Sequence, residues 1–303
     1  MKKLWSRRDV LAAAAYSALP RLSMGDENKA MRTAEIPSSG EQLPVIGLGT
    51  YSVFDVESTD AEIGKKSEIT ALLISHGGSV IDTSPMYNRS EKVIGDIIRA
   101  GTDRGELFLA TKVWTDGREA GIEQMRRSAD LMNTDVIDLM QVHNLRDSAV
   151  HLRSIRESRE AGRVRYSGLT HYTASAHDAL EREMKQFKPE FIQINYSLGE
   201  LEAEQRILPL AQEMGIAVLI NRPFQAGRLF RAVDGRPVPD FAKDFADSWG
   251  QFFLKFIISH PAVACAIPAT SKAHHMMDNL GAGFGALPDS KMRQRMHDFF
   301  VSL

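Results

Sequence analysis

The chain is poor in cysteine: Cys265 is the only one among 303 residues. A lone cysteine excludes an internal disulfide and any metal site that is built from several thiolates. Its neighbours Val263, Ala264 and Ile267 are apolar, which indicates a buried strand. We therefore interpret Cys265 as a small core residue rather than a nucleophile.

Charge of one sign, long apolar runs and metal-ligand clusters are also scarce. The 37 Lys and Arg residues nearly balance the 39 Asp and Glu residues, and the formal net charge is −2. Basic residues interleaved with aromatics are missing from the body of the chain, which argues against nucleic acid as a partner. The uncharged stretch over residues 10–20 is too short for a membrane span of about 20 residues. The His and Asp clusters of a metal-dependent barrel hydrolase are lacking too, so we expect no metal.

The first 25 residues differ in kind from the rest. Lys2, Lys3 and the pair Arg7-Arg8 precede an alanine-rich stretch and then small residues at 23–25. This layout is typical of a secretory signal, and the paired arginines resemble a twin-arginine export signal. We expect residues 1–25 to be an export signal peptide that is read by the twin-arginine export machinery, with a periplasmic or otherwise exported location. The alternative is a frayed amphipathic helix on a protein that stays in the cytoplasm.

After residue 40 the chain alternates between apolar strand-like runs and amphipathic helix-like runs. The expected strands are 45–50, 79–84, 107–113, 135–143, 165–170, 191–197, 216–221 and 263–269. The expected helices are 60–76, 90–100, 118–132, 147–161, 173–186, 203–214, 241–259, 273–282 and 289–301. Several strands are apolar throughout, as in a parallel sheet that is buried on both faces. Eight strands, each followed by a helix, predict a single-domain (β/α)8 TIM barrel over residues 34–303.

A doubly wound sheet is the structural alternative. Its dinucleotide fingerprint has three glycines in the pattern G-x-G-x-x-G after the first strand. Here the first strand ends with Gly47 and Gly49 and lacks the third glycine. The least regular segment, 225–241, is rich in glycine and proline, and we interpret it as a loop over a site.

Four titratable residues are expected at one end of the barrel. Asp82, Lys112 and His143 stand at the ends of three successive strands, and Tyr87 follows in the loop after Asp82. The carboxyl ends of the strands carry the active site in barrels of this kind. None of the four is specific alone, because an Asp there usually caps a turn and a single His is usually structural. Together they indicate a proton donor that is aimed at a carbonyl oxygen.

Each member of this quartet has a chemical role in that interpretation. A phenol has a pKa near 10, and we expect the Lys112 ammonium to lower the pKa of Tyr87. Asp82 would keep the lysine charged and fix its direction. His143 would donate a second hydrogen bond to the substrate oxygen, as in an oxyanion hole.

Several segments resemble those of the aldo/keto reductases, in the same order along the chain. They are 45–50, 82–87 with 90–95, 111–114, 138–143, 191–197 and 267–271. The resemblance implies a (β/α)8 barrel that uses NAD(P)H. It also implies Tyr87 as general acid, Lys112 and Asp82 as the residues that tune it, and His143 as the residue that orients the carbonyl.

The resemblance further implies a site for the nicotinamide. Gln193 matches the family's glutamine, and Thr170-His171 stands where the family has Ser-Asn. Asn221 or Arg222 stands near the place of an aromatic residue that stacks on the nicotinamide ring. The rest of the expected nicotinamide side is Gly49, Thr50, Asp82, Pro223 and Phe224.

The adenosine-phosphate end of the cofactor is expected at the last strand and helix. The residues assigned to it are Thr270, Ser271, Lys272, His275, Asp278 and Asn279. A helix N-terminus is suited to an anion, and Ser271 with Lys272 could serve a 2′-phosphate. This favours NADP, with NAD as the alternative cofactor.

The substrate pocket is expected beside the quartet. Tyr51, Met86 and Trp114 flank the motifs and either line this pocket or pack at its rim. We expect a reductase for a small carbonyl substrate, which run in reverse would oxidise an alcohol. An exported reductase would need a tightly held cofactor or a partner that recycles it. The alternative is a nucleotide-binding sensor or regulatory subunit with little turnover on the same barrel.

Overall fold

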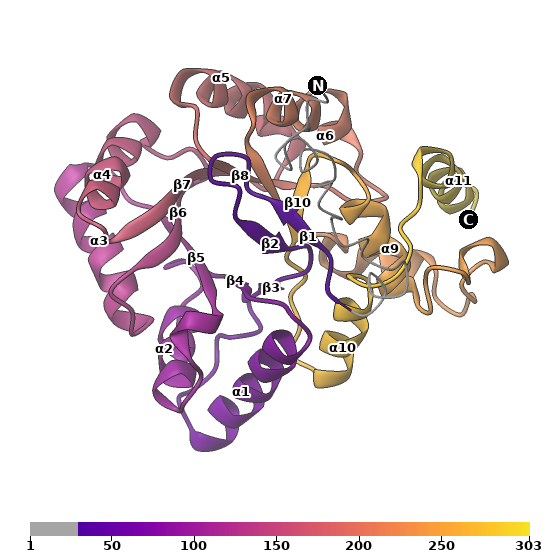
Figure 1. Ribbon diagram of the computed structural model, residues 1–303, viewed down its shortest axis with the longest axis horizontal. Helices are drawn as coiled ribbons and strands as arrows, with labels where there is room; N and C mark the ends of the chain where they lie inside the picture. The colour runs from indigo at the N-terminus through magenta and orange to yellow at the C-terminus, as the bar shows by residue number, and fades with distance from the viewer. Residues whose placement is uncertain (1–29) are drawn as a thin grey trace, which may run out of the picture.

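Eight parallel strands close into a barrel in the computed structural model, which describes residues 30–303 (Figure 1). The strands are β3 (Leu48–Gly49), β4 (Val80–Asp82), β5 (Phe108–Val113), β6 (Ile137–His143), β7 (Val164–Thr170), β8 (Phe191–Asn195), β9 (Ala217–Asn221) and β10 (Val263–Ala266). They neighbour one another in chain order, and parallel bridges from Ile46 to Ala266 and from Gly49 to Ala269 join the first strand to the last. The predicted (β/α)8 barrel is confirmed.

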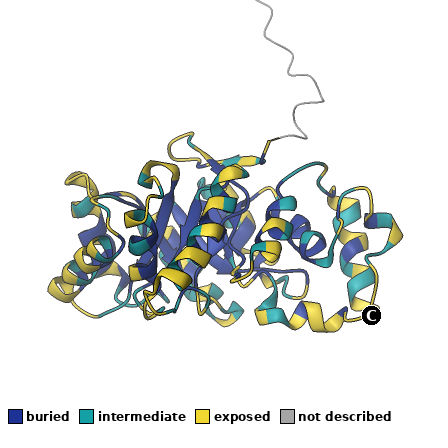
Figure 2. Ribbon diagram, turned by 90° about the horizontal axis from the view of Figure 1, so that it is seen from below, coloured by how far each residue is buried: buried dark blue, intermediate teal, exposed yellow. Residues whose placement is uncertain are grey.

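The helices surround the barrel (Figure 1). They are α1 (Asp60–Ser75), α2 (Ser90–Arg99), α3 (Arg118–Leu131), α4 (Ser148–Glu160), α5 (His177–Phe187), α6 (Glu202–Gln205), α7 (Ile207–Met214), α8 (Arg228–Ala232), α9 (Trp249–Ile258), α10 (Ala273–Gly281) and α11 (Ser290–Val301). The helix expected over 241–259 begins only at Trp249, because the Ser248 side chain accepts the Gln251 N–H and caps it there. Strands and inner helix faces are buried, and the outer faces are exposed (Figure 2).

A short antiparallel hairpin precedes the barrel and was not expected. It pairs β1 (Thr33–Glu35) with β2 (Gln42–Pro44). Ile36 and Leu43 are buried in one apolar cluster with residues of the barrel interior such as Phe108 and Phe191. The hairpin therefore closes one end of the barrel with apolar side chains.

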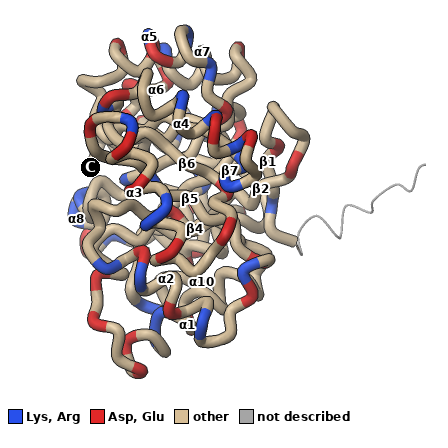
Figure 3. Tube along the Cα trace, turned by 90° about the vertical axis from the view of Figure 1, so that its left-hand side faces the viewer, with Lys and Arg blue, Asp and Glu red and all other residues tan. Residues whose placement is uncertain are grey.

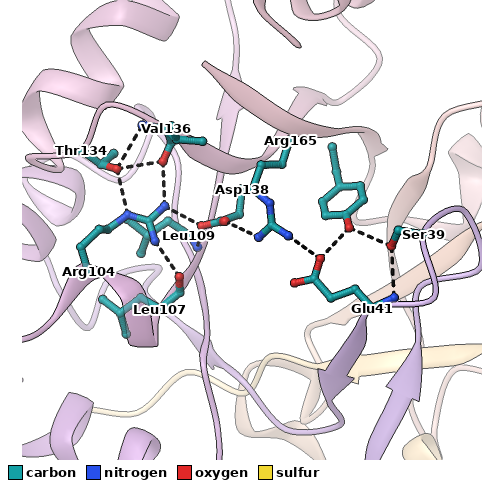
Figure 4. A network of polar contacts seen from close by, with 10 residues as sticks. Ser39, Glu41, Arg104, Leu107, Leu109, Thr134, Val136, Asp138 and Arg165 are labelled. Carbon is teal, nitrogen blue, oxygen red and sulfur yellow. Dashed lines mark hydrogen bonds and ion pairs between the residues drawn. The ribbon is translucent and has the colours of Figure 1, made fainter. Parts of the chain in front are cut away.

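A polar network ties this hairpin to the amino ends of the strands (Figure 4). Asp138 is 4% exposed and accepts hydrogen bonds from Arg104 (2.6 Å), Arg165 (2.7 Å) and the Leu109 N–H (2.8 Å). Arg165 also pairs with Glu41 of the hairpin. Asp138 lies in one of the family-like segments, and in the structure its carboxylate holds this end of the barrel together.

Lys and Arg are interspersed with Asp and Glu along the outer segments (Figure 3). Among residues 30–303, no helix combines the length and the apolar character needed to cross a membrane. The expected export signal at 1–25 lies outside the described residues.

Candidate active site

The strand register brings the quartet to one rim of the barrel. Asp82 is the last residue of β4 and pairs with Ala110 of β5. Two residues further along β5, Lys112 pairs with Gln141 of β6, and His143 ends β6 opposite Thr170. All three side chains therefore lie at the carboxyl end of the barrel.

Lys112 and Asp82 form a buried ion pair. The Lys112 Nζ lies 2.7 Å from Asp82 Oδ1 and donates a second hydrogen bond of 2.7 Å to the Thr83 carbonyl. The two side chains are 1% and 3% exposed. Burial lowers the pKa of Lys112, but the Asp82 carboxylate and the Tyr87 hydroxyl outweigh it and leave the pKa raised. The lysine is therefore a fixed ammonium.

Tyr87 lies directly beside this ammonium. The Lys112 Nζ is 5.0 Å from the centre of the Tyr87 ring, and the Tyr87 N–H donates to the Ser84 carbonyl in a tight turn. Burial raises the pKa of Tyr87, the lysine lowers it, and the Asp82 carboxylate raises it again, so that the net direction is upward. The lysine lowers the pKa of Tyr87 as expected, but burial outweighs this effect. The phenol stays protonated and ready to donate.

His143 is held as a neutral imidazole. Burial, followed by the charge of Lys112 and by His171, lowers its pKa to about 3. Its Nδ1 lies 3.1 Å from the Ser84 Oγ. Because Ser84 Oγ already accepts the Met86 N–H, its own hydrogen is available for Nδ1. The Nε2 of the neutral ring then carries the proton and can donate it.

Two glutamines extend the network from Asp82 across the barrel. The Asp82 Oδ2 accepts from Gln193 Nε2 at 2.7 Å and from Gln141 Nε2 at 3.1 Å. In turn the Gln193 Oε1 accepts from Thr170 Oγ1 at 3.3 Å and from Asn221 Nδ2 at 3.4 Å. Gln141 was not expected here, although it precedes His143 by two residues and so shares its face of β6.

A cavity of about 620 Å³ opens above this network. Asp82, Tyr87 and His143 line it, whereas Lys112 lies buried behind them. Of the residues expected at the nicotinamide, those in the cavity wall are Gly49, Thr50, Thr170, Gln193, Asn221, Arg222, Pro223 and Phe224. Tyr51 and Met86 line its mouth. The segment after β9 supplies one wall through Phe224, Ala226, Gly227 and Phe230. Part of this segment, which was expected to be a loop, forms the helix α8.

Two expected residues lie beside the cavity rather than in its wall. Trp114 packs against His143 with ring centres 6.5 Å apart, and the Arg146 guanidinium lies 4.9 Å from the Trp114 ring centre. His171 is stacked on Tyr172, at 5.4 Å and 4°, and its Nδ1 accepts the Thr173 N–H. Neither side chain belongs to the cavity lining.

The residues assigned to the adenosine phosphate lie in α10 and in the three residues before it, and none of them lines this cavity. Ser271, Lys272 and His275 are exposed there, while Thr270 is buried and its Oγ1 accepts the Lys272 N–H. Asn279 is buried within α10. The Asp278 carboxylate accepts from Ser248 Oγ and Gln251 Nε2 and thereby joins α10 to α9.

Sequence reasoning missed several cavity residues. They are Asn144, Tyr172, Ala226, Gly227, Phe230, Ile267 and Ala269. Asn144 directly follows His143 and has φ of +54°, a conformation that asparagine tolerates better than most residues. Asn144 could have been predicted as a cavity residue, because it directly follows His143 at the carboxyl end of a strand. Across residues 30–303, no group of three or more His, Cys, Asp and Glu side chains is placed to hold a metal ion.

Known proteins resemble this chain over most of its length. The methylglyoxal reductase YeaE of Escherichia coli (strain K12) is 28% identical over 260 residues, covering 82% of this chain and 89% of the relative. The glyoxal reductase of Bacillus subtilis (strain 168) is 25% identical over 248 residues, covering 80% and 83%. An aldo-keto reductase from Klebsiella pneumoniae, solved in complex with NADPH, has a TM-score of 0.74 and 25% identity, covering 89% of this chain and 95% of that one.

A family model matches most of the chain as well. The sequence model of the aldo/keto reductase family matches residues 45–295, which run from the first barrel strand into the last helix. This range contains the whole quartet and the cavity above it. The chain therefore belongs to the aldo/keto reductase family.

Proposed function

We propose that this protein is an NADP-dependent reductase that converts an aldehyde or ketone to an alcohol. The observation that carries the proposal is the buried Lys112–Asp82 pair beneath a protonated Tyr87, beside a neutral His143, at the floor of a cavity. The activities named for its relatives, methylglyoxal and glyoxal reduction, agree with this chemistry, and the NADPH of the Klebsiella structure agrees with the cofactor.

The residues present fit such a cofactor. The cavity next to Tyr87 is walled by Thr170, Gln193 and Asn221, and Asn221 offers a buried acceptor atom. The exposed Ser271, Lys272 and His275 at the start of α10 would hold the 2′-phosphate, where backbone N–H groups add to the attraction for an anion. When bound, NADPH supplies the hydride.

The quartet supplies the proton and holds the carbonyl. His143 Nε2–H donates to the carbonyl oxygen and orients it, and the Tyr87 hydroxyl gives that oxygen its proton as negative charge develops. The phenolate left on Tyr87 is stabilised by the Lys112 ammonium, which Asp82 keeps charged and in place. Run in reverse, the same groups accept the proton of an alcohol.

The cavity mouth offers a largely apolar surface to the substrate, with the Arg222 guanidinium beside Tyr172. Tyr51, Met86, Tyr172 and Phe230 are exposed by 65%, 38%, 45% and 39%, and all four line the cavity. Large apolar side chains exposed together around a cavity indicate a binding surface.

We propose export by the twin-arginine machinery for this reductase, with a tightly held or locally recycled cofactor. The sensor alternative gains no support from a quartet that is fully assembled.

The test is turnover of NADPH by purified protein. Wild type should oxidise NADPH with at least one member of a panel of small and aromatic aldehydes. Tyr87→Phe should lose about 10²- to 10⁴-fold in kcat, the range of a general acid. Tyr166→Phe, which removes a phenol at the opposite end of the barrel, should keep the wild-type rate. Unchanged turnover in Tyr87→Phe would contradict the mechanism, and NADPH binding without turnover in wild type would favour a sensor.

A further inference from the structure

Asn221, the last residue of β9, lines the cavity and has a buried acceptor atom without a partner. Its Nδ2 donates to the His171 carbonyl at 3.1 Å and to Gln193 Oε1 at 3.4 Å. Its Oδ1 is buried and, within residues 30–303, accepts no hydrogen bond. A buried carbonyl oxygen without a partner is costly, since the lost hydration is not replaced. A ligand that brings an N–H or O–H to this atom would remove that cost.

The orientation of the Asn221 amide is dictated from Asp82. The Asp82 carboxylate can only accept, so Gln193 must turn its NH2 toward it, at 2.7 Å. Gln193 then presents Oε1 to Asn221, which must turn its own NH2 toward that oxygen and toward the His171 carbonyl. A flipped Asn221 would set oxygen against two oxygens. The Oδ1 of Asn221 is therefore fixed as the amide atom that is left without a partner.

Gln193 itself has no hydrogen-bonding capacity left. Its NH2 donates to Asp82 and to Gln141 Oε1 (3.3 Å), and its Oε1 accepts from Thr170 and Asn221. The other amide side chain with a buried, unpartnered oxygen in the described cavity wall is Asn144. Asn144 follows His143 and so lies on the side where the carbonyl is held. Asn221 lies on the other side, with Thr170 and Gln193.

We propose that Asn221 Oδ1 accepts the N–H of the primary carboxamide of the nicotinamide ring. This rests on the proposed NADP-dependent function, because the hydride must arrive next to Tyr87 and the nicotinamide must therefore occupy this part of the cavity. The carboxamide NH2 is the hydrogen-bond donor that this ring carries. His171, which stands where the family has asparagine, turns its ring to Tyr172 instead. Asn221 thus supplies the side-chain amide that position 171 lacks. Asp82, which binds Lys112, also orients the Asn221 amide through Gln193.

Binding of cofactor analogues tests this without any turnover. In the 3-acetylpyridine analogue of NADP⁺ a methyl group replaces the carboxamide NH2, whereas the thionicotinamide analogue keeps the NH2 and loses the oxygen. Dissociation constants are measured by calorimetry for wild type, Asn221→Leu and Asn144→Gly. The glycine suits the positive φ of Asn144 and makes this a matched control that removes an amide from the same cavity.

Wild type should bind the acetylpyridine analogue about tenfold more weakly than NADP⁺, as one lost hydrogen bond of about 1.4 kcal/mol predicts, and the thionicotinamide analogue within about twofold. In Asn221→Leu the discrimination should fall to about twofold or less, and Asn144→Gly should keep the wild-type ratio. Equal binding of both analogues by wild type, or full discrimination in Asn221→Leu, would overturn the proposal. If Asn221→Leu does not fold, Asn221→Ala takes its place in the same comparison. Discrimination without carbonyl reduction would support the proposal and contradict the reductase function, and absence of nucleotide binding would contradict both.

Discussion

The two ends of the barrel each hold a buried aspartate, and they use it differently. At the amino end Asp138 is bound by two arginines and a backbone N–H, and Arg165 continues to the hairpin through Glu41. At the carboxyl end Asp82 is bound by Lys112 and two glutamines, and the chain of bonds stops at a free Asn221 oxygen.

We infer that the network at the amino end stabilises the barrel and that the network at the carboxyl end carries the proposed chemistry. The arginines of the amino end are partly exposed, and both pair with Asp138. Because an arginine side chain is always charged, this network has no group that exchanges a proton. The carboxyl end gathers a lysine, a phenol and an imidazole around one carboxylate. Burial raises the pKa of Tyr87 and lowers that of His143, whereas the Asp82 carboxylate and Tyr87 raise the pKa of Lys112 against its burial. Groups with shifted pKa values beside unused hydrogen-bonding capacity are typical of a functional site.

The largest effect is expected from Lys112→Met. It leaves the Asp82 carboxylate buried without its cation, which should lower the free energy of unfolding by about 3–5 kcal/mol. Turnover should fall with it, since the Tyr87 phenolate loses its stabilising charge. Urea unfolding measures the free energy of unfolding, and NADPH oxidation measures turnover. Adding Asp82→Leu should restore part of the stability and none of the activity; recovery of activity in the double variant would refute the role of the pair.

The next effect is a loss of stability in acid that comes from His143. Its pKa is near 6.5 when unfolded and about 3 when folded, so the unfolded state binds more protons between these values. Stability from this group is complete above about pH 6.5 and falls as the pH drops toward 3, by on the order of 3 kcal/mol at pH 4. Unfolding free energies of wild type and His143→Gln at pH 4 and 7 should show a shallower pH dependence in the variant. Equal slopes would mean that His143 is not held neutral.

A smaller effect is expected from Ser84→Ala. It removes the hydroxyl that fixes the His143 ring through Nδ1, and the kcat should fall about tenfold, the factor for one hydrogen bond of about 1.4 kcal/mol. Ser84→Thr, which keeps a hydroxyl, should recover most of the rate. Nitrogen NMR of His143 should show Nε2 protonated in wild type and a mixture of tautomers in Ser84→Ala. A single unchanged tautomer in the alanine variant would exclude this role for Ser84.

The barrel was predictable because each inner strand is an apolar run between helix-like segments. The hairpin was not, since strands of three residues at 33–35 and 42–44 carry too little pattern to recognise. The late start of α9 depends on one capping serine, Ser248, within a segment whose composition still favours helix.

The quartet was predictable from strand ends, whereas the balance of forces on it was not. Whether Tyr87 is acidified depends on how much burial opposes Lys112, and burial is a property of the folded chain. The place of Trp114 and the freedom of the Asn221 oxygen likewise depend on neighbours from distant segments, Arg146 and Gln193. Sequence spacing does not contain these contacts.

The comparison between the two ends is tested most directly by two matched variants, Asp82→Asn and Asp138→Asn. Each removes one buried negative charge and keeps the shape of the side chain. We predict that Asp82→Asn lowers kcat for NADPH-dependent carbonyl reduction by about a hundredfold, at the low end of a general-acid contribution. Asp138→Asn should lower the free energy of unfolding by about 1–3 kcal/mol and leave kcat within about twofold. Equal losses of kcat in both variants, or full activity in Asp82→Asn, would contradict the division of roles between the two ends.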